Sequence, residues 1–131
     1  MRSDIDIIHL SDLHFGQRHR YVGNTPFETL LSKTCEDLDI LSDRFEIHPS
    51  IIIITGDLAE RSVPDEYKKV REFLNGLLKK LSLDSSRVVI VPGNHDVNYE
   101  LYEGFEKIYE AHGRAFDPPY FEKFENFKEF Y

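Results

Sequence analysis

The sequence predicts an α/β fold built on a mostly parallel sheet flanked by helices. Three short apolar runs, residues 5–10, 50–55 and 87–92, alternate with two longer segments of helical periodicity. This order is typical of parallel strands joined by right-handed crossovers. Each run also ends in a polar cluster, as expected where the carboxyl ends of parallel strands meet at one edge of a sheet.

The first strand and helix follow from residue type and spacing. Residues 5–10 are rich in β-forming residues. A helix is then expected to open at TPFE, because Thr25 can cap it, Pro26 suits the first helical position and Glu28 can complete a capping box. We expect this helix to run to about Arg44. Its expected buried face consists of Leu30, Leu31, Leu38 and Leu41.

The second strand contains four consecutive isoleucines within residues 50–55. Such a strand has no polar face, as expected when helices cover both sides of a sheet. The next helix is expected to open near SVPDE with Ser62 as its cap, and the third strand lies at 87–92. The helix between them repeats apolar residues at helical spacing: Tyr67, Val70, Phe73, Leu74, Leu77, Leu78 and Leu81.

The remainder of the chain predicts two more helices. One spans residues 97–116 and ends near Gly113, and the other spans 119–131. The second carries an aromatic stripe at three-residue spacing that needs a surface to cover: Phe121, Phe124, Phe127 and Phe130. With 131 residues we expect a single, truncated domain, with a motif-bearing core at 4–98 and a helical extension at 99–131.

Composition narrows the function classes. The net charge of −8 argues against a surface built to hold the nucleic acid backbone. The single cysteine, Cys35, cannot form an internal disulfide, so a reduced cytoplasm is the expected location. Neither a signal peptide nor a membrane span of roughly 20 apolar residues is expected from the sequence.

The first two polar clusters offer carboxylate and imidazole ligands. Asp12 and His14 are two positions apart after the first strand, so both side chains can point to one side and chelate an ion. Asp57 lies in GD after the second strand, where its two oxygens can bridge two cations. Structural roles are the alternatives. Asp12 could be a turn residue, His14 a capped or packed imidazole, and the GD sequence a simple turn.

The third cluster, GNHD, combines three roles that a hydrolytic site needs. The amide oxygen of Asn94 can coordinate a cation, His95 can transfer protons, and Asp96 can orient His95. An Asn-rich turn is the alternative. Three clusters of ligand-type residues at three strand ends favour a metal site over three unrelated turns.

These residues resemble a known family. The series DLH, GD and GNHD resembles the first three motifs of the calcineurin-like metallophosphoesterases, which are dinuclear phosphatases, phosphodiesterases and nucleases. The resemblance covers residues 4 to about 98. It implies that this chain is the N-terminal half of a four-layer α/β/β/α sandwich. It also implies that Asp12 and His14 bind a first metal, that Asp57 bridges two metals and that Asn94 binds the second.

The resemblance further implies the chemistry. His95 would contact the phosphate and protonate the leaving group, while Asp96 would hold His95 in position. A metal-bridging hydroxide would attack the phosphorus of a phosphate mono- or diester. The motifs SDLHFG and VPGNHD look most like the phosphodiesterase side of the family, and nucleotides are among the candidate substrates. The complete domain would hold two divalent ions such as Mn, Fe or Zn.

The chain also departs from the family pattern. The family completes its site with a later histidine and a Gly-His-x-His motif, and this chain contains neither. One metal or none is therefore expected in this chain. Two alternatives to a phosphoesterase enzyme stay open. The chain could be a catalytically incomplete metal- or phosphate-binding regulatory module of a larger protein, or two chains could assemble one site by self-association through the exposed sheet face. In the enzyme, a further C-terminal segment would carry the remaining ligands.

Overall fold

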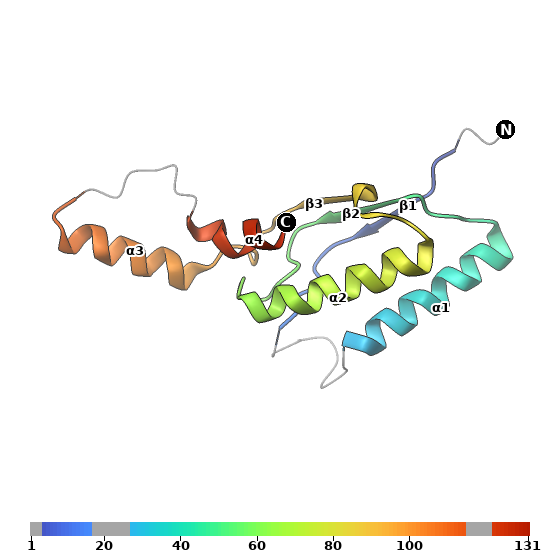
Figure 1. Cartoon of the computed structure of the whole chain (residues 1–131), viewed down its shortest axis with the longest axis horizontal. Helices are drawn as coiled ribbons and strands as arrows, with labels where there is room; N and C mark the ends of the chain where they lie inside the picture. The colour runs from blue at the N-terminus through green and yellow to red at the C-terminus, as the bar shows by residue number, and fades with distance from the viewer. Residues whose placement is uncertain (1–3, 17–26, 115–121) are drawn as a thin grey trace.

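Three parallel strands and two long helices form the body of the protein. The computed structural model describes residues 4–16, 27–114 and 122–131. In chain order these elements are β1 (Ile7–Leu10), α1 (Phe27–Phe45), β2 (Ile51–Thr55), α2 (Pro64–Leu81) and β3 (Val88–Val91). Strand β2 lies in the centre and pairs in parallel with both neighbours. The predicted α/β fold with a parallel sheet flanked by helices is confirmed (Figure 1).

The strand register brings the polar loops together at one edge of the sheet. Leu10 pairs with Ile54, and Thr55 pairs with Val91, so the three strands end within one residue of the same level. An isolated parallel bridge between Phe15 and Ala59 continues the contact between the first two loops. The carboxyl ends of the strands therefore deliver their following residues to one place.

Helices α1 and α2 cover the same face of the sheet (Figure 1). Ile52 and Ile54 point into this covered face and have no exposed surface. The predicted apolar face of α2 packs against the core. Leu78 and Leu81 are partly buried, and the other five members are buried: Tyr67, Val70, Phe73, Leu74 and Leu77. The predicted face of α1 also packs against this core, with Leu38 buried and Leu30, Leu31 and Leu41 partly buried. The expected cap residues Thr25 and Pro26 lie outside the described residues.

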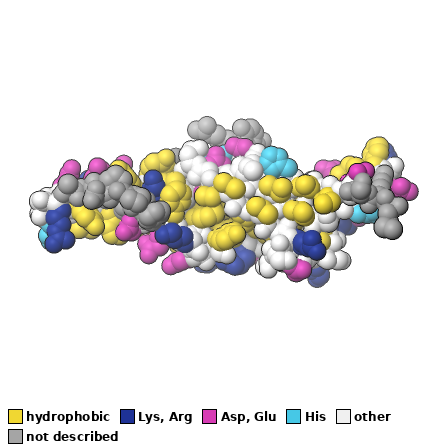
Figure 2. Space-filling model, turned by 90° about the horizontal axis from the view of Figure 1, so that it is seen from above, with side chains coloured by type: hydrophobic (Ala, Val, Ile, Leu, Met, Phe, Trp, Pro, Cys, Tyr) yellow, Lys and Arg dark blue, Asp and Glu magenta, His cyan; other side chains and the backbone are white. Residues whose placement is uncertain are grey.

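The opposite face of the sheet is apolar and open in the described residues. Ile7, Val89 and Val91 are each about half exposed. Figure 2 shows hydrophobic side chains gathered over the middle of the molecule on the side away from α1 and α2 in Figure 1. The described helices thus cover β2 on one face, whereas helices on both faces were expected from its isoleucines.

The start of α2 differs from the expected one. The expectation that Ser62 caps the helix is wrong, because Val63 occupies the N-cap position and Pro64 is the first helical residue. The Glu66 carboxylate supplies the capping interaction by accepting hydrogen bonds from the backbone amides of Val63 and Arg61. Ser62 lies one residue earlier, is fully buried, and uses its hydroxyl in a long-range contact instead.

The C-terminal region contains one long helix and two short ones. Helix α3 (Tyr99–Ala111) is capped by the side chain of Asn98 and is followed by Gly113 at φ 63°, close to its predicted end. The expected last helix is replaced by η2 (Glu122–Phe124) and α4 (Glu125–Phe130). Two members of the aromatic stripe, Phe127 and Phe130, are buried, and Phe121 lies outside the described residues. Among the described helices, none combines the length and the apolar character that crossing a bilayer requires.

Candidate metal centre

Backbone hydrogen bonds hold the loops after β1 and β2 side by side. The amide of Asp12 donates to the Gly56 carbonyl (3.2 Å), and the amide of His14 donates to the Asp57 carbonyl (2.8 Å). The amide of Gly56 in turn donates to Val91 at the end of β3 (2.8 Å). The first two polar clusters are therefore joined by the backbone rather than placed independently.

The residues of these loops adopt unusual backbone conformations. Asp12, His14 and Asp57 have φ values of 56°, 46° and 54°. A left-handed conformation costs a non-glycine residue of order 1 kcal/mol or more, and such residues concentrate at functional sites. Here the surrounding loop contacts maintain the strained conformation at three residues that all carry ligand-type side chains.

Two carboxylates converge on one imidazole nitrogen. Nε2 of His14 lies 3.9 Å from Oδ2 of Asp57 and 4.0 Å from Oδ1 of Asp12. Two donor atoms bound tetrahedrally to one ion at about 2.1 Å are about 3.4 Å apart, so each carboxylate would have to approach His14 by about 0.5 Å to share an ion with it. His14 therefore lies close to both carboxylates, but Asp12 is not a member of the described group whose ligand atoms all lie within 4.8 Å of one another.

His95 lies beside the same group. Its ring meets that of His14 edge-on, with ring centroids 4.6 Å apart. His14, Asp57 and His95 each offer a ligand atom, and these atoms lie within 4.8 Å of one another. The sequence predicted a proton donor at this position. The sequence did not predict that His95 lies within ligand distance of His14 and Asp57, because this depends on how the turn orients the imidazole ring.

The protonation pattern of the His95 ring follows from its partner. Nδ1 of His95 lies 2.8 Å from the backbone carbonyl oxygen of Glu60. A carbonyl oxygen only accepts, so Nδ1 carries the hydrogen and Nε2 is the nitrogen with a free lone pair in the neutral ring. Sequence reasoning missed this Glu60 contact, because a backbone acceptor carries no side-chain signal.

Asp57 divides its two oxygens between the protein and the site. Oδ1 accepts a hydrogen bond from the backbone amide of His95 (2.9 Å), while Oδ2 faces His14. Gly93 packs directly against this carboxylate, and a Cβ at position 93 would lie 2.5 Å from the amide nitrogen of Asp57. The glycine thus allows the loops after β2 and β3 to approach closely.

Asp96 has different partners from those expected. It is fully buried, and its carboxylate accepts from the amides of Leu58 (3.2 Å), Ala59 (3.1 Å) and Gly93 (2.9 Å). The hydroxyl of Tyr67 donates to it as well (3.2 Å). Asp96 therefore joins two loops, whereas a direct contact with the neighbouring histidine ring was expected.

The other sequence candidates occupy less constrained positions. Asn94 is exposed on the same turn, and its backbone carbonyl accepts from the amide of Val97 (3.4 Å). Its role as a ligand of a second metal stays a prediction. A histidine that is not among the predicted ligands, His9, lies on the open face of the sheet, with Nε2 2.7 Å from Oγ1 of Thr55.

Comparison with known proteins agrees with the motif resemblance. The chain matches the family model described as calcineurin-like phosphoesterase over residues 5–131. It is 30% identical over 100 residues to an uncharacterized metallophosphoesterase-like protein of Bacillus subtilis, covering 74% of this chain and 18% of that protein. It is 32% identical over 101 residues to a cAMP/cGMP dual specificity phosphodiesterase of Mycobacterium tuberculosis, covering 76% and 30%. A glycerophosphodiester phosphodiesterase of Enterobacter lignolyticus is 29% identical over 91 residues, covering 69% and 29%. The chain therefore spans less than a third of the length of these relatives.

Proposed function

Because the chain belongs to the calcineurin-like phosphoesterase family, we propose that it carries metal-binding residues of a metal-dependent hydrolase that cleaves phosphate diesters. The main support is the convergence of Asp12 and Asp57 on Nε2 of His14, at 4.0 and 3.9 Å. The names of two relatives support diesters over monoesters, and one of them supports nucleotide substrates.

The donor set fits a transition metal ion. Carboxylate and imidazole ligands suit Mn, Fe, Zn or a related divalent ion better than Mg. His14 and Asp57 would hold the first ion together with Asp12, and Asp57 and Asn94 would contribute to a second ion in the complete domain. Such ions, when bound, acidify water and offset negative charge on the oxygens of the phosphate group.

The protein residues supply orientation and a proton. The bond from the His95 amide fixes Oδ1 of Asp57, which leaves Oδ2 directed toward His14. The Glu60 carbonyl holds Nδ1–H of His95, so Nε2 is the nitrogen that can gain a proton and pass it to the leaving-group oxygen.

A regulatory metal-binding module is the second candidate. His95 lies within ligand distance of His14 and Asp57. If His95 bound the ion through Nε2, the ring could not protonate a leaving group, and the chain would bind metal without turnover.

Titration with Mn²⁺, followed by the EPR signal of the free ion, tests the metal-binding part. We expect one saturable site in the wild-type chain and at least about tenfold weaker binding in Asp57→Asn, given the usual cost of disturbing a metal site. Asp43→Asn is the matched control, because this exposed residue of α1 undergoes the same change in charge. Absence of saturable binding, or equal losses in the two variants, would contradict the proposal.

Hydrolysis of bis(4-nitrophenyl) phosphate by the Mn²⁺-loaded chain separates the two candidates. Turnover that is lost in His95→Gln while Mn²⁺ binding is retained would support the hydrolase. Mn²⁺ binding that is lost in His95→Gln, together with no turnover by the wild-type chain, would support the regulatory module.

A further inference from the structure

Two buried hydroxyl groups contact Asp96, the residue that follows His95. Tyr67 on α2 is 4% exposed and Ser62 is fully buried. The Tyr67 hydroxyl donates to Oδ1 of Asp96 (3.2 Å), and the Ser62 hydroxyl donates to the backbone carbonyl of Asp96 (2.9 Å). The two hydroxyl oxygens are 3.0 Å apart. Asp96 is therefore held at both its side chain and its backbone.

The carboxylate of Asp96 transmits this restraint to the site. Its other partners are the amides of Leu58 and Ala59, directly after Asp57, and the amide of Gly93, on the turn that carries His95. Four donors use the acceptor capacity of one carboxylate, so its orientation is defined by all of them together. Tyr67 is the donor in this set that comes from a helix rather than from a loop.

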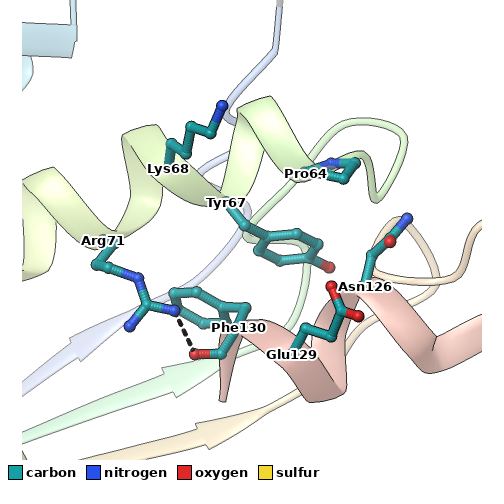
Figure 3. A pocket seen from close by; sticks show the side chains of 7 residues that line it. All are labelled: Pro64, Tyr67, Lys68, Arg71, Asn126, Glu129 and Phe130. Atoms are coloured by element: carbon teal, nitrogen blue, oxygen red, sulfur yellow. Dashed lines mark hydrogen bonds between the residues drawn. The ribbon is translucent and has the colours of Figure 1, made fainter.

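Helix α4 holds the ring of Tyr67. The Tyr67 ring stacks on Phe130 with centroids 5.0 Å apart and meets Phe127 edge-on at 6.3 Å. Figure 3 shows the Tyr67 ring between α2 and α4, on a pocket of about 130 Å³ next to Phe130. Arg71 donates to the Phe130 carbonyl (2.9 Å), and Asn126 donates to the Ser62 carbonyl (2.7 Å). These contacts position α4 against α2.

Ser62 shows that this arrangement is held under strain. Its φ is 56°, and its carbonyl also accepts from the side chain of Asn98 (3.1 Å). A buried non-glycine residue stays in the left-handed region only when its contacts outweigh the backbone cost. The hydrogen bonds of Ser62, Tyr67 and Asp96 therefore define one specific geometry.

We propose that Tyr67 is a positioning residue for the metal centre. Its hydroxyl fixes the carboxylate of Asp96, and Asp96 fixes the loops that carry Asp57 and His95. The role in metal binding rests on the proposed function, whereas the ordering of the two loops does not. Burial raises the pKa of Tyr67 well above its ordinary value of 10.0, so the hydroxyl remains a donor at neutral pH.

Tyr67→Phe tests the proposal because it removes the hydroxyl and keeps the ring on Phe130. Amide hydrogen exchange measured by NMR in the metal-free chain is the first readout. We expect faster exchange at Leu58, Ala59 and Gly93, with no change at Ile52 and Ile54 of β2. The second readout is Mn²⁺ affinity, which we expect to fall about tenfold, as for other outer partners of metal ligands.

Tyr99→Phe is the control, because it removes the same atom from an exposed position on α3. Phe130→Leu keeps the Tyr67 hydroxyl but removes the stacked ring, and should produce the same selective pattern more weakly. Unchanged exchange at the three amides, or a uniform increase that includes β2, would overturn the proposal. Unchanged Mn²⁺ affinity in Tyr67→Phe would also overturn it. Absence of Mn²⁺ binding by the wild-type chain would instead contradict the proposed function, and the exchange rates would still decide whether Tyr67 orders the loops.

Discussion

Asp57 and Asp96 follow neighbouring strands of one sheet, and both accept hydrogen bonds from backbone amides, yet their carboxylates have different surroundings. The Asp57 side chain is 15% exposed, with one oxygen bound to the His95 amide and the other facing His14. Asp96 is fully buried, and both of its oxygens accept two hydrogen bonds each. A carboxylate with a free oxygen can bind an ion, whereas one whose acceptors are all used can only organise its neighbours.

The two carboxylates also depend on each other. Asp96 ties Gly93 to the residues after Asp57, and Gly93 then packs against Asp57 itself. The position of the free oxygen of Asp57 is therefore set by the buried acid on the next loop. Substitutions should separate these roles, because a change at Asp96 should affect folding and a change at Asp57 should affect ligand binding.

Replacing Asp96 by alanine should produce the largest effect. The amides of Leu58, Ala59 and Gly93 would lose their shared acceptor, and each unsatisfied buried donor costs about 1–3 kcal/mol. We expect the free energy of unfolding to fall by more than about 3 kcal/mol. Urea denaturation followed by circular dichroism measures it.

Asp12→Asn is the control for this prediction, because the Asp12 side chain is 66% exposed and asparagine tolerates the left-handed backbone at this position. It should change the unfolding free energy by less than about 0.5 kcal/mol. A loss of less than about 1 kcal/mol in Asp96→Ala would show that water replaces the carboxylate, and the contrast with Asp57 would then fail.

Replacing Gly93 by alanine should act on both carboxylates with a smaller effect. The new Cβ would collide with Oδ1 of Asp57 and would lie 2.5 Å from its amide nitrogen, so the two loops must separate. We expect a loss of about 1–3 kcal/mol in unfolding free energy, the usual cost of overpacking. Mn²⁺ binding should weaken as Asp57 moves.

Gly104→Ala is the matched control, because a Cβ at this position on α3 meets no atom within 4 Å. It should stabilise the chain by roughly 0.5–1 kcal/mol through helix propensity and leave Mn²⁺ binding unchanged. Equal effects of the two substitutions would contradict a specific approach of the loops at Gly93.

The sequence predicts which loops form the site, but it does not predict that the Asp57 carboxylate faces the site while the Asp96 carboxylate is buried. Parallel strands place their carboxyl ends together, so the clusters at Asp12, Asp57 and Asp96 had to lie near one edge of the sheet. The burial of Asp96 could not be foreseen, because its main partners are backbone amides, which every sequence contains. A serine before a Pro-Asp-Glu sequence is typical of a helix start, but the hydrogen bond of Ser62 to the Asp96 carbonyl determines where this residue lies.

The smallest effect should come from Asp12→Asn. This substitution tests whether a more exposed carboxylate contributes less to Mn²⁺ affinity. Asp12 and Asp57 lie at nearly the same distance from Nε2 of His14, but the side chain of Asp12 is 66% exposed and that of Asp57 is 15% exposed. Water screens the attraction between an exposed carboxylate and a cation, and binding also costs the exposed side chain conformational entropy. Mn²⁺ affinity should therefore fall by less than about tenfold, or 1.4 kcal/mol, with an unchanged unfolding midpoint. Titration of Asp12→Asn beside Asp57→Asn measures the order. A larger loss for Asp12 would mean that distance to His14, rather than the shielding of the carboxylate, determines how strongly each acid contributes.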